Sequence, residues 1–122
     1  MRRICVVTGS RADYGILYWI MRELRDMPDV ELKIVVTGMH LAPEYGLTWR
    51  QIEADDFAIA EKITTLLSDN TPVGIAKSVG LGVIGFADFF TKMRADIAVL
   101  LGDRFEILAA AQAAYLASVP LA

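Results

Sequence analysis

The sequence has few of the residues that most often build metal, redox and disulfide sites. Its 122 residues include one cysteine and one histidine. A single cysteine excludes an internal disulfide and fits a cytoplasmic protein. Because Cys5 lies within an apolar run, we expect it to be a buried structural thiol. No cluster of histidine, cysteine and carboxylate residues has metal-ligand spacing, so no metal site is predicted.

Long uncharged apolar runs and basic clusters are absent as well. No run of eighteen or more uncharged apolar residues occurs, so we predict no membrane span. The net charge is −3 without a basic cluster, which argues against nucleic acid as a partner. Yet 55% of the residues are hydrophobic, above the usual ~45–50%. Such a composition leaves apolar surface exposed in a small domain, so we expect a homo-oligomer or a piece of a larger protein.

The usual nucleotide fingerprints are missing from the expected places. The first strand runs into "TGSRADYG", which lacks the G-x-G-x-x-G of dinucleotide-binding folds, and no acidic residue follows the second strand, at 37–39. A match to that pattern does occur at Gly80, Gly82 and Gly85, but it follows a polar loop and falls within a helical pattern. We therefore expect these glycines to pack closely against another helix or subunit. There is no P-loop and no G-x-S-x-G elbow.

What the sequence does contain is a regular alternation of strand and helix patterns. Apolar, β-branched runs predict strands, and apolar residues at helical spacing predict helices. The strands are expected at 3–8, 31–37 and 97–101. An extended or β segment is expected at 57–63, and another strand is expected to begin at Val119. The helices are expected at 13–27, 48–54, 76–93 and 105–117. This order predicts an α/β fold, a parallel sheet with flanking helices and right-handed crossovers. In the first helix, the expected apolar face comprises Leu17, Ile20, Leu24 and Met27.

Three predicted strands end in similar sequences, "TGSRADYG", "TGMHLAPEYG" and "LGDRFE". Each has a glycine just past the strand, then polar or charged residues before a helix. Ligands of parallel α/β sheets bind at these carboxyl ends. In the first, Ser10 and Asp13 have capping-box spacing, and a helix that starts there directs N–H groups at the strand end, which suits a phosphate. Arg11 adds a charged, forked donor; the alternative is a plain helix cap with a solvated arginine.

The other two strand ends leave alternatives open in the same way. Asp103 and Glu106 have a spacing that suits a helix start, but a carboxylate at this edge of the sheet could also move a proton or hold a sugar hydroxyl. Arg104 could pair with a phosphate. His40 is either a structural residue or part of a site, since it lies just past the second strand.

Taken together, "TGSRADYGIL", "TGMHLAPEYGLTWRQIEADDF", "SVGLG" and "LLGDRFEILAAA" resemble the hydrolysing UDP-N-acetylglucosamine 2-epimerases of sialic-acid biosynthesis. The resemblance implies that residues 1–122 form an incomplete, Rossmann-like N-terminal domain of a GT-B-type two-domain fold, without the C-terminal domain. It implies conversion of UDP-N-acetylglucosamine to N-acetylmannosamine and UDP, by elimination and then hydration. No cofactor is implied, and these residues alone are expected to be inactive.

The resemblance also assigns roles to individual residues. Asp103 matches the active-site aspartate, as an acid, a base or a group that orients the sugar, and His40 matches a histidine near the active site. Arg11, Gly15 and Arg104 match positions that contact the nucleotide or its phosphates. The alternatives are a non-hydrolysing epimerase, an epimerase for a 2,4-diacetamido sugar nucleotide, a non-catalytic module that binds nucleotide sugars, and a glycosyltransferase.

Overall fold

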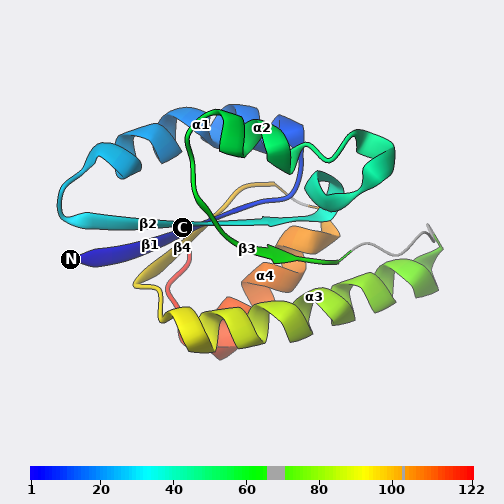
Figure 1. The fold of residues 1–122 in the computed structure, drawn as a ribbon. Coiled ribbons are helices and arrows are strands. Elements are labelled where there is room, and N and C mark those ends of the chain that lie inside the picture. Colours follow the sequence, from blue (N-terminus) through cyan, green and yellow to red (C-terminus); the bar gives the residue numbers. More distant parts are fainter. Residues whose placement is uncertain (66–70, 103) are drawn as a thin grey trace.

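Four parallel strands form the centre of the structure, as the alternating sequence pattern predicts. The computed structural model describes residues 1–65, 71–102 and 104–122. Its strands are β1 (Arg2–Thr8), β2 (Val30–Thr37), β3 (Ile59–Ile63) and β4 (Ile97–Leu100). They lie in the order β3-β2-β1-β4, and every adjacent pair is parallel (Figure 1). The segment expected as extended or β is thus a full strand, whereas the strand expected from Val119 is an isolated parallel bridge between Ala98 and Leu121.

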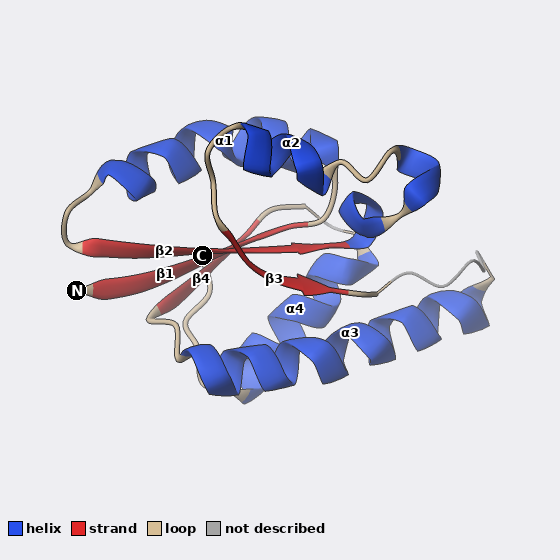
Figure 2. Cartoon of the chain, viewed as in Figure 1, coloured by secondary structure: helices blue, strands red, loops and turns tan. Residues whose placement is uncertain are grey.

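Helices cover both faces of this sheet (Figure 2). On one face lie α1 (Arg11–Asp26) and α2 (Trp49–Ala54), and on the other lie α3 (Pro72–Met93) and α4 (Phe105–Leu116). Successive strand side chains point to opposite faces, so each strand contributes to two cores. One core joins strand residues such as Val6 and Ile34 to α1, and the other joins Val7 and Val35 to α3 and α4. Cys5 is fully buried in the second core, as predicted, and burial raises the pKa of its thiol to about 12.

Helix α1 begins earlier than the sequence pattern indicated and turns a different face to the core. Ser10 is its N-cap residue, so the helix starts at Arg11, and Met27 caps its other end. The buried side chains are Tyr14, Leu17 and Met21. The prediction that Ile20 belongs to this face was wrong: it is 48% exposed. An aromatic residue at position 14 fixes the rotation of the helix, and Ile20 then lies to one side of the buried stripe.

The glycines of α3 allow its close packing at two of the three expected positions. A Cβ atom at Gly82 would lie 2.7 Å from Cβ of Ala109 on α4, and one at Gly85 would lie 2.6 Å from Cγ2 of Ile63 on β3. No such contact exists at Gly80, where no atom of the described residues outside the neighbouring turns of α3 lies within 4 Å of an added Cβ. The prediction of close packing is therefore confirmed for Gly82 and Gly85 and not for Gly80.

Helix α3 is long and apolar enough to cross a membrane, judged by length and composition alone. Core helices of soluble proteins can pass the same test, and one face of α3 lies against the sheet through Phe86, Phe89 and Phe90. Its other face carries exposed apolar side chains, among them Ile84, which is 66% exposed.

The order of the strands indicates where along the sheet a ligand would bind. From β1 the chain moves outward to β2 and β3, and it then crosses to β4 on the other side of β1. The order therefore reverses between β1 and β4, and in open parallel sheets ligands bind beside the carboxyl ends of the strands at such a reversal.

Candidate functional site

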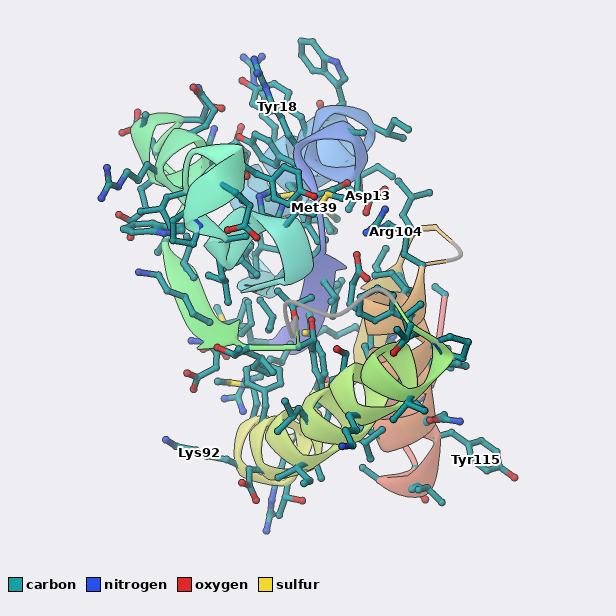
Figure 3. All side chains as sticks on the ribbon, turned by 90° about the vertical axis from the view of Figure 1, so that its right-hand side faces the viewer. Asp13, Tyr18, Met39, Lys92, Arg104 and Tyr115 are labelled. Carbon is teal, nitrogen blue, oxygen red and sulfur yellow. The ribbon has the colours of Figure 1, made fainter. Side chains whose placement is uncertain are left out.

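The ends of β1 and β2 contact each other directly at this edge, which faces the viewer in Figure 3. The N–H group of Met39 donates to the carbonyl oxygen of Gly9 over 2.9 Å. Gly38 adopts a φ of +60°, which favours glycine, and a Cβ there would lie 2.8 Å from the same carbonyl oxygen. The glycine after β2 is thus required by this close approach of two backbone segments, whereas a Cβ at Gly9 would meet the side chain of Glu106.

The N-terminus of α1 borders the same edge. The hydroxyl of Ser10 accepts a hydrogen bond from the N–H group of Asp13 over 3.2 Å, so the predicted cap forms. Asp13 Oδ2 is buried and has no hydrogen-bond partner among the described residues. A Cβ at Gly102, two residues after the end of β4, would lie 3.5 Å from Asp13 Oδ1. Asp13 therefore places a carboxylate between the ends of β1 and β4.

A cavity of about 480 Å³ opens beside these residues. It is lined by Ser10, Arg11, Ala12, Asp13, Met39, Tyr45, Thr48, Gly102 and Arg104. Figure 3 shows that Asp13 and Arg104 lie next to each other, with Met39 beside Asp13. Both arginines that the sequence predicted as phosphate contacts therefore line one cavity, and its volume falls within the range of about 300–1,000 Å³ that is usual for small-molecule sites.

His40 lies behind the cavity wall in the interior. It is fully buried, and its Nε2 and Nδ1 atoms each lie 2.9 Å from a threonine hydroxyl oxygen, that of Thr8 and that of Thr48 respectively. The Thr8 hydroxyl also lies 3.4 Å from the carbonyl oxygen of Ser10, so it links the ring to the N-cap residue of α1. Burial lowers the pKa of His40 to about 4, so the ring is neutral near pH 7. Because Thr48 lines the cavity, His40 connects that wall to the end of β1.

Arg104 is held by a buried carboxylate. Its Nε donates to Glu106 Oε1 over 2.8 Å, and the Glu106 side chain is 0% exposed. Glu106 Oε2 is buried without a hydrogen-bond partner among the described residues. Arg104 itself is the N-cap residue of α4, without a side-chain capping bond. Sequence reasoning assigned Glu106 a capping role and missed this arrangement; the signal was its place two residues after an arginine at a strand end.

The other predicted site residues lie at different distances from the cavity. Asp103 lies outside the described residues. Gly15 lies in α1 one turn after Arg11, is exposed, and does not line the cavity. None of the residues in 1–65, 71–102 and 104–122 has an atom within 4 Å of a Cβ added there, the helix itself excepted. The predicted roles of Asp103, Gly15 and His40 in a reaction stay predictions.

The arrangement is better suited to an anion than to a metal ion. Within residues 1–65, 71–102 and 104–122, no group of three or more histidine, cysteine or acidic residues could hold a metal ion. Two arginines and a helix N-terminus instead provide positive charge and N–H donors for phosphate oxygens. Asp13 Oδ2 and Glu106 Oε2 are buried acceptors that lack a donor among the described residues.

Comparisons with known proteins relate the chain to one protein family. Residues 22–122 match the family model described as UDP-N-acetylglucosamine 2-epimerase. The chain is 41% identical over 121 residues to a hydrolysing UDP-N,N'-diacetylbacillosamine 2-epimerase of Legionella pneumophila, covering 99% of this chain and 32% of the relative. It is 38% identical over 120 residues to a hydrolysing GDP/UDP-N,N'-diacetylbacillosamine 2-epimerase of Campylobacter jejuni, covering 98% of this chain and 31% of the relative. The chain thus spans about a third of the length of these relatives.

The fold comparison adds a solved structure with a ligand. The UDP-GlcNAc 2-epimerase of Neisseria meningitidis bound to UDP-GlcNAc superimposes with a TM-score of 0.81 at 14% identity, over 98% of this chain and 31% of that one. The fold class predicted from the sequence is confirmed: a Rossmann-like parallel sheet with flanking helices that corresponds to part of the N-terminal domain of a GT-B-type fold.

Proposed function

Because the chain belongs to the UDP-N-acetylglucosamine 2-epimerase family, we propose that it is the N-terminal part of a hydrolysing 2-epimerase of a UDP-linked 2-acetamido sugar. The observation that carries the proposal is the cavity at the ends of β1 and β4, which is lined by Arg11, Arg104 and the N-terminus of α1. These groups suit the diphosphate of a nucleotide sugar. Activity belongs to the longer protein, in the cytoplasm, and residues 1–122 alone are expected to be inactive.

The proposed reaction proceeds in two steps. In the first, a base removes the proton at sugar C2, the bond between C1 and the UDP oxygen breaks, and a C1–C2 double bond forms. UDP leaves with the electron pair of the broken bond. In the second, the hydroxyl of a water molecule adds to C1, and a proton is added to C2 on the face opposite to the one from which the first proton was removed. The products are the free 2-epimeric sugar and UDP, so the net reaction consumes one water.

The residues of the chain take defined parts in this scheme. Positive charge from Arg11 and Arg104 stabilises the diphosphate as it leaves. Asp103 is proposed as the acid, the base or the group that orients the sugar, since a carboxylate near the reacting carbon can transfer protons. His40 is neutral because of its lowered pKa, and since it is buried it is proposed to act on the site through Thr48, which lines the cavity. Gly15 is proposed to leave room for the nucleotide beside α1.

The identity of the sugar divides the proposal into two candidates. The first is UDP-N-acetylglucosamine, which gives N-acetylmannosamine for sialic-acid biosynthesis. The second is a 2,4-diacetamido sugar nucleotide, and the names of the Legionella and Campylobacter relatives favour it. The two substrates differ at C4, where one carries a hydroxyl and the other an acetamido group, whereas the proposed chemistry at C1 and C2 is the same.

Proton NMR in D2O tests the proposal with the full-length protein. Each of the two nucleotide sugars is offered separately, and the expected result for one of them is a free 2-epimeric sugar deuterated at C2, together with UDP. Accumulation of a UDP-linked 2-epimer would establish a non-hydrolysing epimerase instead. No reaction of either substrate, with UDP binding intact, would leave a nucleotide-sugar binding module and overturn the enzymatic proposal.

The Asp103→Asn variant tests the assignment of that residue in the same assay. We expect loss of product while circular dichroism shows an unchanged fold, because asparagine keeps the shape of the side chain and cannot transfer the proton. Turnover close to that of the wild type would contradict a catalytic role for Asp103.

We also propose that the protein is a homo-oligomer. Apolar side chains on α3 and α4 are exposed, including Ile84 at 66%, Tyr115 at 76% and Leu116 at 75%. Analytical ultracentrifugation of the full-length protein measures the assembly directly, and a monomer at micromolar concentration would refute this part of the proposal.

A further inference from the structure

Glu106 has an environment that a helix-capping role does not explain. It is the second residue of α4, where the helix dipole favours a carboxylate, yet such residues are normally solvated. Here the side chain is 0% exposed. Its only hydrogen bond among the described residues goes to Arg104, and its Oε2 atom has no partner there.

The space that Glu106 occupies is created by glycines at the ends of two strands. A Cβ at Gly9, after β1, would lie 2.8 Å from Glu106 Cγ and 2.9 Å from Oε1. A Cβ at Gly38, after β2, would lie 3.0 Å from Oε1. The carboxylate is therefore fixed between the carboxyl ends of β1 and β2, directly behind the cavity.

The contact with Arg104 leaves that arginine open towards the cavity. Oε1 accepts from Nε, the nitrogen nearest the aliphatic part of the side chain. The terminal nitrogens of the guanidinium have no hydrogen-bond partner among the described residues, and Arg104 lines the cavity with a side chain that is 39% exposed. An arginine held through Nε keeps its terminal N–H groups free for a second, anionic partner.

We propose that Glu106 is a positioning residue that holds the Arg104 guanidinium in the orientation that binds the diphosphate of the nucleotide, an inference that rests on the proposed function. A free arginine side chain loses rotational freedom when it binds an anion. Glu106 restricts that freedom before the ligand arrives, so the complex forms with less loss of entropy. Its negative charge, buried behind the guanidinium, also keeps the arginine beside the cavity when no ligand is present.

The Glu106→Gln variant of the full-length protein tests this inference, because glutamine keeps the size of the side chain and removes its charge. Binding of UDP, UMP and uridine is measured by calorimetry. We expect the affinity for UDP to fall about 3–10-fold, the affinity for uridine to stay unchanged, and KM to rise more than kcat falls. A purely structural role predicts an equal change for all three ligands. The matched control is Glu31→Gln, which removes an ion pair with Arg3 at the opposite ends of β1 and β2 and should change none of them.

A double-mutant cycle with Arg104→Ala shows whether Glu106 acts through the arginine. Once Arg104 is absent, Glu106→Gln should have no further effect on UDP affinity, and this comparison holds even if the variants differ in stability. An equal loss of affinity in both backgrounds would overturn the inference, as would unchanged UDP binding by Glu106→Gln. A wild-type protein that does not bind UDP would overturn the proposed function, and with it the role of Glu106.

Discussion

An added methyl group should have opposite effects at Gly80 and Gly82, two positions of the same helix. At Gly80, where the described part of the chain has no atom within 4 Å of an added Cβ, alanine should stabilise the protein by about 1 kcal/mol, since glycine is a poor helix former. At Gly82 the same methyl group would lie 2.7 Å from Ala109 Cβ and 2.8 Å from Thr65 Cγ2. Carbon atoms pack best at about 3.5–4.0 Å, so α3 and α4 would have to separate.

The net effect at Gly82 follows from two opposing contributions. Overpacking of a well-packed core costs typically about 1–3 kcal/mol, and Ala109 Cβ cannot rotate away because it is attached directly to the backbone. With the helix-propensity gain of about 1 kcal/mol subtracted, Gly82→Ala should destabilise the protein by up to about 2 kcal/mol. For a domain of this size, 1 kcal/mol corresponds to roughly 4 °C in Tm. The Tm of Gly80→Ala should therefore lie above that of Gly82→Ala by about 4–12 °C, with the wild type not above the first and not below the second.

Thermal unfolding followed by circular dichroism measures both variants in the same full-length background. The second step combines Gly82→Ala with Ala109→Gly, which removes the methyl group that the new one would meet. The double variant should lose less free energy of unfolding than the sum of the losses of the two single variants, because the steric conflict between the two methyl groups is gone. A Gly82→Ala variant as stable as Gly80→Ala would refute the described contact between α3 and α4.

Three further predictions concern the site. Arg11→Ala should weaken UDP binding at least about tenfold through the loss of a charge-assisted hydrogen bond, and unchanged affinity in calorimetry would refute its role. Gly15→Ala should raise the stability by about 1 kcal/mol while it weakens UDP binding. A UDP affinity equal to that of the wild type would show that the nucleotide does not approach this glycine. The third prediction concerns the pH dependence of folding, because burial of the neutral His40 ring lowers its pKa from 6.5 in the unfolded chain to about 4 in the folded protein. The stabilisation that this neutral ring contributes should be complete above pH 6.5. It should be lost as the pH falls towards 4, and the total loss should be roughly 3 kcal/mol. Denaturation of the wild type and His40→Gln across this range measures the difference, and parallel pH profiles would contradict it.

The positions of strands and strand ends could be predicted from the sequence. The runs before Gly9, Gly38 and Gly102 are apolar and β-branched, and the glycines that follow mark where the backbone turns. From that pattern alone, Arg11 and Arg104 could be assigned to one edge of a parallel sheet, and both line the cavity.

Contacts between distant segments could not be predicted in the same way. Ile20 has helical spacing, but the rotation of α1 depends on how Tyr14 packs against Phe57 and His40, which lie far away in the sequence. The burial of Glu106 depends likewise on two glycines that belong to other strands. Side-chain chemistry and local spacing identify candidate residues, whereas only the assembled sheet shows which of them touch.

The pairing of β1 with β4 also determines when the site can form during synthesis and folding. Ile4 pairs with Ile97, so this contact closes a chain loop that includes β2, β3 and three helices. Long-range pairs of this kind form late, because the entropy of loop closure must be overcome before the contact contributes. Arg11 is synthesised early, whereas Gly102 and Arg104, which line the same cavity, are synthesised only after β4. A nucleotide that contacts both sides of the cavity would therefore bind only after β1 and β4 have paired, and by binding it would favour the completed sheet.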